Sequence, residues 1–130
     1  MPTPYRLEFH GLGSELRVDI RGDERLPENV LACWLQIAGE VRLRNATRLL
    51  AVSHVAGEPM QVDDMRGFFA SMSGLGLEGV RVAYVDMAGF KTPLMETAEI
   101  LASEHGFSAR VFDNRIAAEL WLRHGSPQEP

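Results

Sequence analysis

The chain has 130 residues, 45% of them hydrophobic and 24% charged, which fits one globular domain with a sizeable core. Its formal net charge of -5 argues against general nucleic-acid binding, which requires a basic surface. No apolar run has the length of a membrane span, the N-terminus lacks the pattern of a secretory signal, and the single cysteine cannot form an internal disulfide. We therefore expect a cytoplasmic protein.

The first predicted elements are a β-hairpin, a helix and a buried strand. Apolar and polar side chains alternate over residues 5–10 and again over 16–21, and a glycine-containing turn at 11–14 separates the two runs. From Pro27 to about Leu43 the apolar residues recur at helical spacing. The apolar run at 49–52 that follows is typical of a strand covered on both faces.

The middle of the chain predicts a second helix and another strand. Asp63 and Asp64 favour the positive end of a helix dipole and mark the first turn, and the helix is expected to end at Gly74. The inner side of this helix is predicted to consist of Val62, Met65, Phe69 and Met72. The apolar run at 80–85 then predicts the next strand.

The last part of the chain predicts a helix, a strand and a final helix. Thr92 is the expected N-cap of the first of these helices, and Gly106 closes it in the left-handed conformation. Residues 109–112 form the expected strand, and Asp113 or Asn114 caps the final helix. The inner side of the final helix is predicted to carry Ile116, Ala117, Leu120 and Trp121.

The predicted order of elements is therefore β-β-α-β-α-β-α-β-α. Strands that alternate with helices indicate an α/β fold with a mostly parallel sheet, and the N-terminal hairpin is expected at one edge of that sheet. The sequence contains no internal repeat and no linker, so we expect a single domain over residues 1–125 and a frayed polar tail at 126–130.

Motifs for catalysis or cofactor binding do not stand out in the sequence. Gly74–Gly79 matches the dinucleotide fingerprint, but it lies between a predicted helix and a strand, the reverse of the order that brings a helix N-terminus to a pyrophosphate. The four histidines lack metal-ligand spacing, and Cys33 on a predicted core helix is best interpreted as a small buried hydrophobe. We therefore predict no catalytic residue, no metal and no cofactor.

A binding site is expected at the carboxyl ends of the strands, where open α/β sheets place their ligands. The polar and apolar side chains at these ends are Ser53, His54, Asp86 and Met87. Beyond Asp86 the loop continues to Phe90, Lys91 and Thr92, which predicts a position for a small apolar or anionic ligand at a helix start. The ordinary alternative is that Thr92 caps its helix, Phe90 packs against a neighbour and Lys91 is solvated.

Methionines add an apolar component to this predicted site. Apart from Met1, all of them lie between residues 60 and 95, and flexible thioethers suit an adaptable pocket between the second and third helices. Met65 and Met72 are the two that we place at this pocket. Core packing is the alternative explanation for both.

Three phrases of the sequence, together with the order of elements, resemble the SpoIIAA-like family, which groups STAS domains with bacterial STAS and CRAL-TRIO-related proteins. They are Asp-Asp-Met-Arg-Gly-Phe-Phe at 63–69, Val-Ala-Tyr-Val at 82–85, and Arg-Val-Phe at 110–112 followed by Ala-Ala-Glu-Leu-Trp-Leu at 117–122. The resemblance covers residues 5–122 and implies a binding or regulatory domain of SpoIIAA-like fold, which is not an enzyme.

The resemblance also implies alternatives for the partner. Relatives near the CRAL-TRIO fold imply a lipid-like ligand, whereas STAS domains imply a protein partner and a serine that is phosphorylated within an Asp-Ser-Ser-Gly-like turn. The corresponding turn at 53–59 lacks this phrase, and Ser53 is its nearest hydroxyl. Other expectations are a homodimer, peripheral membrane contact through the arginines at 42, 44 and 48, and, third, an enzyme built on His54 and Asp86.

Overall fold

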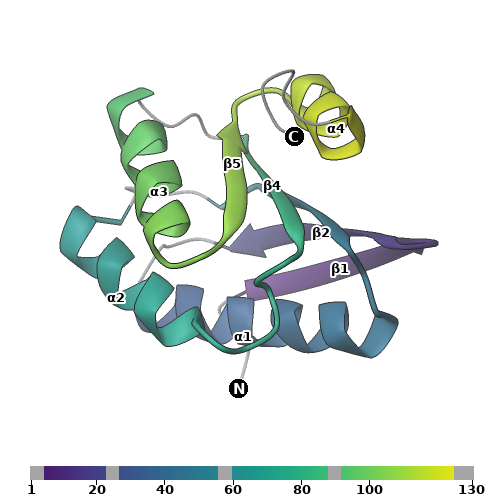
Figure 1. The fold of residues 1–130 in the computed structure, drawn as a ribbon, viewed down its shortest axis with the longest axis horizontal. Coiled ribbons are helices and arrows are strands. Elements are labelled where there is room, and N and C mark those ends of the chain that lie inside the picture. Colours follow the sequence, from purple (N-terminus) through teal and green to yellow (C-terminus); the bar gives the residue numbers. More distant parts are fainter. Residues whose placement is uncertain (1–4, 23–26, 56–59, 88–91, 125–130) are drawn as a thin grey trace.

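The computed structural model describes residues 5–22, 27–55, 60–87 and 92–124, which form an α/β fold around one mixed sheet (Figure 1). The order of elements is the predicted one. The strands are β1 (Tyr5–Leu12), β2 (Glu15–Gly22), β3 (Arg48–Ser53), β4 (Arg81–Asp86) and β5 (Ser108–Phe112). The helices are α1 (Pro27–Arg44), α2 (Val62–Met72), α3 (Thr92–Glu104) and α4 (Arg115–His124).

The N-terminal hairpin has a tighter turn than the sequence predicts. Strands β1 and β2 pair antiparallel, and Leu12 lies opposite Glu15, so that only Gly13 and Ser14 form the turn. Gly13 has a φ of 62°, which glycine adopts without the steric penalty of a side chain. The expected turn at 11–14 was too long because β1 continues through Gly11 and Leu12.

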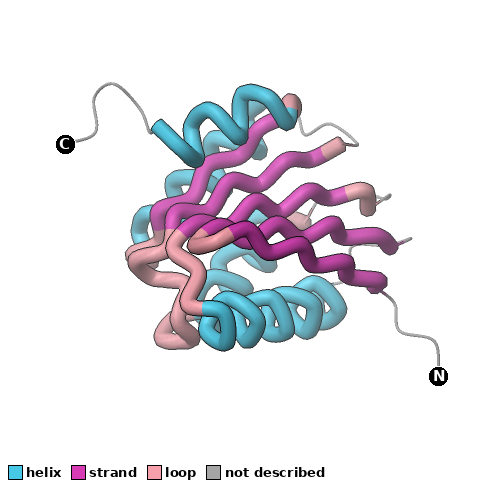
Figure 2. The backbone as a smooth tube through the Cα atoms, turned by 90° about the vertical axis from the view of Figure 1, so that its right-hand side faces the viewer, coloured by secondary structure: helices cyan, strands magenta, loops and turns pink. Residues whose placement is uncertain are grey.

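The strands lie side by side in sequence order, β1-β2-β3-β4-β5, and the pairs from β2 to β5 are all parallel (Figure 2). Because each parallel strand lies beside the one before it, connections of one hand place the crossover helices α1, α2 and α3 on the same face. Helix α4 follows the edge strand β5 and covers the opposite face (Figure 1). The prediction of a mostly parallel sheet with the hairpin at one edge is confirmed.

Each face of the sheet has its own hydrophobic core. Leu49 and Ala51 of β3 belong to the core under α1, α2 and α3, whereas Leu50 and Val52 of the same strand belong to the core under α4. All four side chains are buried, which confirms that β3 is covered on both faces. The core under α4 is completed by Ala83, Val85, Ala118, Trp121 and Leu122.

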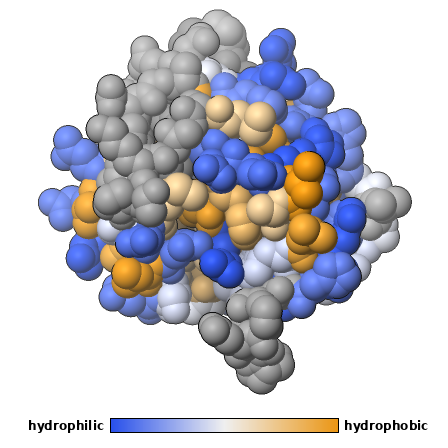
Figure 3. All heavy atoms as spheres, turned by 90° about the horizontal axis from the view of Figure 1, so that it is seen from above, coloured by the Kyte–Doolittle hydropathy of each residue, from blue (hydrophilic) through white to orange (hydrophobic). Residues whose placement is uncertain are grey.

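Two predicted inner faces are wrong in part. Val62 of α2 is exposed, and in α4 the side chains of Ile116 and Leu120 are 70% and 57% exposed, while Ala117 also faces solvent. The buried side chains of α4 are instead Ala118, Trp121 and Leu122. Both sets recur at helical spacing, so periodicity alone does not decide which of them faces the sheet. Seen from above, the surface is mixed, with apolar patches lying among hydrophilic atoms in the middle of the view (Figure 3).

The predicted helix ends agree better with the structure than the predicted inner faces do. Asn114 is the cap of α4, because its side-chain Oδ1 accepts hydrogen bonds from the backbone N–H groups of Ile116 (2.8 Å) and Ala117 (3.1 Å). Gly106 follows α3 with a φ of 84°, as predicted for its left-handed cap. Among the described residues, none of the helices combines the length and apolar composition required to cross a membrane.

Candidate functional site

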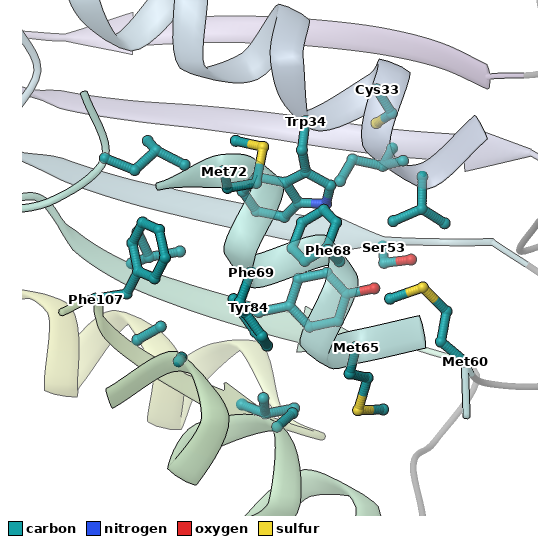
Figure 4. A pocket seen from close by; sticks show the side chains of 18 of the residues that line it. Cys33, Trp34, Ser53, Met60, Met65, Phe68, Phe69, Met72, Tyr84 and Phe107 are labelled. Carbon is teal, nitrogen blue, oxygen red and sulfur yellow. The ribbon is translucent and has the colours of Figure 1, made fainter. Parts of the chain in front are cut away.

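The sheet and the three helices on one of its faces form the walls of a partly open cavity of about 160 Å³ (Figure 4). Every described strand and each of α1, α2 and α3 contributes to its wall. The lining residues are Tyr5, Ile20, Val30, Cys33, Trp34, Ser53, Val55, Met60, Met65, Phe68, Phe69, Met72, Leu77, Val82, Tyr84, Ala98, Glu99, Ala102, Phe107, Ala109, Arg110 and Val111. Most of these side chains are apolar, so the cavity favours an apolar occupant.

Aromatic rings form much of the wall. Trp34 of α1 lies 6.2 Å, between ring centroids, from both Phe68 of α2 and Tyr84 of β4. Phe69 lies 5.2 Å from Phe68 and 6.0 Å from Phe107, which precedes β5. Edge-to-face and tilted contacts of this kind fix ring orientations, so the aromatic wall has a defined shape.

Methionines form the second part of the wall, at α2 and the segment before it. Met60 is half-buried, and Met65 and Met72 are 4% and 1% exposed. Their unbranched thioether side chains adapt to the shape of an occupant more readily than rings do. The cavity thus combines a fixed aromatic part with an adaptable methionine part.

Polar groups in the wall are few. The hydroxyl of Ser53 is fully buried at the end of β3, and Tyr84 adds a phenol. Glu99 and Arg110 form an ion pair with 3.5 Å between Oε2 and Nε, and Oε2 of Glu99 also accepts a hydrogen bond from the Val111 N–H. Burial raises the pKa of the Cys33 thiol to about 12, so this cysteine is protonated at neutral pH and is a poor nucleophile.

Three of the predicted site residues lie at the cavity. Ser53, Met65 and Met72 line it, and the place predicted for the pocket, between the second and third helices, forms one part of its wall. Asp86 is buried beside them as the register partner of Ser53 on β4, but it is not a lining residue. Met87 is 54% exposed. Phe90, Lys91 and the side chain of Thr92 lie outside the described residues.

His54 lies on the opposite face of the sheet, in a cluster around Asp19 of β2. The buried carboxylate of Asp19 accepts two hydrogen bonds of 3.1 Å from Arg17, and Nε2 of His54 lies 3.2 Å from its Oδ1. Nε2 of His10 lies 3.7 Å from its Oδ2. The structure therefore pairs His54 with Asp19 and not with Asp86. We call His10, Arg17, Asp19 and His54 the Asp19 cluster.

Opposing effects act on the Asp19 carboxyl. Burial alone raises its pKa, but the hydrogen bonds from Arg17 and His54 and their electrostatic attraction together outweigh burial, so the pKa lies below its ordinary value. Asp19 is thus an anion in the folded protein whose charge is balanced within the cluster. In the part of the chain that the structure describes, no three His, Cys, Asp or Glu side chains are arranged to hold a metal ion.

The Gly74–Gly79 segment connects a helix to a strand, as the sequence predicts. It lies between the end of α2 and the start of β4, and Gly74, Gly76 and Gly79 have positive φ angles. The backbone N–H of Gly74 donates a 2.6 Å hydrogen bond to Glu78, and bonds of this kind hold the pKa of the Glu78 carboxyl below its usual range. The match to a dinucleotide fingerprint is therefore a glycine-rich loop between a helix and a strand.

The sequence prediction missed the aromatic wall and the Asp19 cluster. Trp34, Phe68 and Tyr84 follow ordinary helix and strand patterns, and these patterns indicate burial without showing that the rings leave a space between them. Asp19 falls on the polar side of its strand, so alternation alone predicts a solvated side chain. Its contact with His54 depends on the pairing of β2 with β3, for which the sequence has no local signal.

Comparisons with known proteins do not assign the chain to a family. No protein-family model matches it, and no curated protein matches it. The interpretation of its function therefore depends on the geometry of the cavity and of the Asp19 cluster.

Proposed function

We propose that this protein is a non-enzymatic binding module that holds a small molecule with an apolar body between α1, α2, α3 and the sheet. The observation that carries this proposal is the cavity of about 160 Å³ with its mainly apolar wall. Protein interiors are close-packed, and an apolar space of roughly 150 Å³ is known to accept a ligand as large as benzene.

The size of the cavity sets the size of the ligand and its affinity. A molecule of about 6 to 9 non-hydrogen atoms buries about 200 Å² of apolar surface, which at about 25 cal/mol per Å² contributes about 5 kcal/mol. This sets a lower limit of about 0.2 mM for the Kd, because the ligand's loss of translational and rotational freedom opposes binding.

We also propose that the domain belongs to the SpoIIAA-like fold, with support from the element order β-β-α-β-α-β-α-β-α. Of the two partner classes that the resemblance implies, a small ligand has the better support. The Ser53 hydroxyl is fully buried, so a kinase would reach it only after local opening of the structure. This burial disfavours a phosphorylation switch at Ser53.

Titration with benzene, toluene and indole tests the proposed function. We expect saturable binding with a Kd of 1 mM or below for at least one probe, measured from amide chemical-shift changes around the cavity. Native mass spectrometry of protein purified from cells adds a search for a retained ligand. Absence of saturable binding by all three probes would contradict the proposal.

A matched pair of variants tests whether the probes bind in the cavity. Ala98→Leu places a larger side chain in the cavity wall, and Ala70→Leu makes the same change at an exposed position on α2 that does not line the cavity. We expect Ala98→Leu to weaken probe binding about tenfold or more, because loss of about 1.4 kcal/mol corresponds to a factor of ten. Ala70→Leu should bind as the unmodified protein does. Equal binding by both variants would place the probes elsewhere.

A further inference from the structure

Among the described residues, the hydroxyl group of Ser53 in the cavity wall has a hydrogen without an acceptor. Ser53 is the last residue of β3 and is 0% exposed, and its Oγ accepts a 3.3 Å hydrogen bond from the Val55 N–H. A serine hydroxyl also has one hydrogen to donate. Within the described ranges, Ser53 makes no other side-chain hydrogen bond. The Ser53 oxygen is thus engaged as an acceptor, and its hydrogen remains free to be donated to an acceptor atom of a molecule in the cavity.

The position of this donor is well defined. Ser53 pairs in register with Asp86, and Tyr84, two residues earlier on β4, projects from the same face of the sheet. In the close view of the cavity, the hydroxyls of Ser53 and Tyr84 lie on the side where Met60 is found, away from Phe107 (Figure 4). The donor is thus at one end of an otherwise apolar space.

The wall also disfavours an ionised ligand. Glu99 and Arg110 are the charged residues among those that line the cavity, and they form an ion pair with each other. Oε2 of Glu99 is further occupied by the Val111 N–H. A carboxylate or ammonium group in the cavity would lose its hydration without meeting a counter-charge that is not already paired.

We infer that the cavity selects a small neutral molecule with an apolar body and one hydrogen-bond acceptor, such as a carbonyl or ether oxygen, and that Ser53 donates to this acceptor. The inference rests on the proposed function, because it assigns the ligand class of the same cavity. Ser53 is a specificity-determining residue in this assignment, while the rings and methionines supply the bulk of the contact.

A pair of probes with the same shape tests the inference. Cyclohexanone and methylenecyclohexane differ only in a carbonyl oxygen that replaces a terminal CH₂ group. We expect Ser53→Ala to weaken cyclohexanone binding about fivefold, which is the typical effect of one neutral hydrogen bond. The same variant should leave methylenecyclohexane binding unchanged within about twofold. The affinities are measured by amide chemical-shift titration, after thermal melting has shown that the variant is folded.

Two further variants control for loss of packing. Ser53→Cys retains a side chain of similar size but has a much weaker donor, so it should reproduce the effect of Ser53→Ala, and it replaces that variant if Ser53→Ala does not fold. Met60→Ala removes wall contacts without touching the donor, so it should weaken both probes by the same factor. Cyclohexanecarboxylate is expected to bind more weakly than cyclohexanone at pH 7.

The possible results separate this inference from the proposed function. If neither neutral probe nor any aromatic probe binds, the proposed function is wrong. If both neutral probes bind but Ser53→Ala and Ser53→Cys change both affinities by the same factor, the cavity binds ligands without selecting an acceptor, and Ser53 has a structural or water-binding role. Binding of the carboxylate as tightly as the ketone would overturn the assignment to neutral ligands.

Discussion

The two faces of the sheet are packed differently. Under α1, α2 and α3 the wall residues leave a space of about 160 Å³, although aromatic rings and methionines surround it. Under α4 the residues Leu50, Val52, Ala118 and Leu122 are all at most 2% exposed and form a second core. The same strands thus support a face with a partly open cavity and a face on which one short helix covers the core.

Among the described residues, each face of the sheet has paired polar groups and one buried donor group without an acceptor. On the α4 face the Asp19 carboxylate is contacted by Arg17, His54 and His10, and Arg81 donates to the carbonyl oxygens of Trp121 (3.3 Å) and Leu122 (3.4 Å). On the cavity face the Ser53 hydroxyl retains an unused hydrogen among the described residues. On the α4 face the indole Nε1 of Trp121 is also buried without a hydrogen-bond partner among the described residues, but Trp121 does not line the cavity. The cavity beside Ser53 is therefore why we place function on the opposite face.

The largest effect is expected from a truncation in the core under α4. Leu122→Ala removes a side chain that is 0% exposed, and we expect the free energy of unfolding to fall by about 3 kcal/mol, since the vacated volume is not refilled. Urea denaturation followed by circular dichroism measures this change. Leu120→Ala, two residues earlier and 57% exposed, is the matched control and should cost less than about 0.5 kcal/mol. Equal losses would mean that the assignment of the inner face of α4 is wrong.

The next effect concerns the Asp19 cluster. Asp19→Asn removes the charge that Arg17 and His54 contact, and we expect a loss of about 2 kcal/mol at pH 7 because hydrogen bonds to a charged group are lost. Glu8→Gln on neighbouring β1 is the control. Its ion pair with Arg21 is exposed and 3.8 Å long, so its loss should cost less than about 0.5 kcal/mol.

The stabilisation from Asp19 should also depend on pH in a definite direction. Because the pKa of Asp19 is lower in the folded protein, its contribution to stability is fully present above the ordinary aspartate pKa of about 4. The contribution is lost as the pH falls through the lowered value, since the unfolded chain then binds the proton first. Urea denaturation at pH 7, 4 and 3 should show the difference between the unmodified protein and Asp19→Asn shrinking at acid pH. A difference that stays constant would contradict the lowered pKa.

Much of the fold was predictable because it depends on local patterns. Alternation gave the hairpin, helical spacing gave α1, and the run at 49–52 gave β3 with both faces covered. The inner face of α4 was not predictable, because Ile116 and Leu120 satisfy helical spacing as well as Ala118 and Leu122 do. Which set is buried depends on where the helix meets the sheet, and this position is set by tertiary contacts.

The site was predictable only where strand ends or the clustering of methionines along the chain indicated it. Ser53 was predicted because it lies at the carboxyl end of a parallel strand, and Met65 and Met72 because methionines cluster along the chain. The pairing of His54 with Asp19 was missed because these residues lie 35 positions apart and meet only through the register of β2 and β3. A cavity is also a property of packing, so no residue spacing in the sequence predicts it.

The smallest effect on the free energy of unfolding is expected at the cavity face itself, from the titration of the Cys33 thiol. Burial raises its pKa from 9.0 to about 12, so the folded protein keeps the thiol protonated above the pH at which the unfolded chain ionises. The stabilising effect of this burial is present below pH 9 and is lost as the pH rises above it, by about 1 kcal/mol at pH 10. Cys33→Ala lacks this titration, so the stability of the unmodified protein should fall relative to the variant between pH 8 and pH 10 by about that amount. Urea denaturation at both pH values measures the difference.

A thiol that reacts rapidly with a disulfide reagent at pH 8 in the folded protein would instead show that water reaches Cys33, and the cavity face would then be more open than its apolar wall indicates.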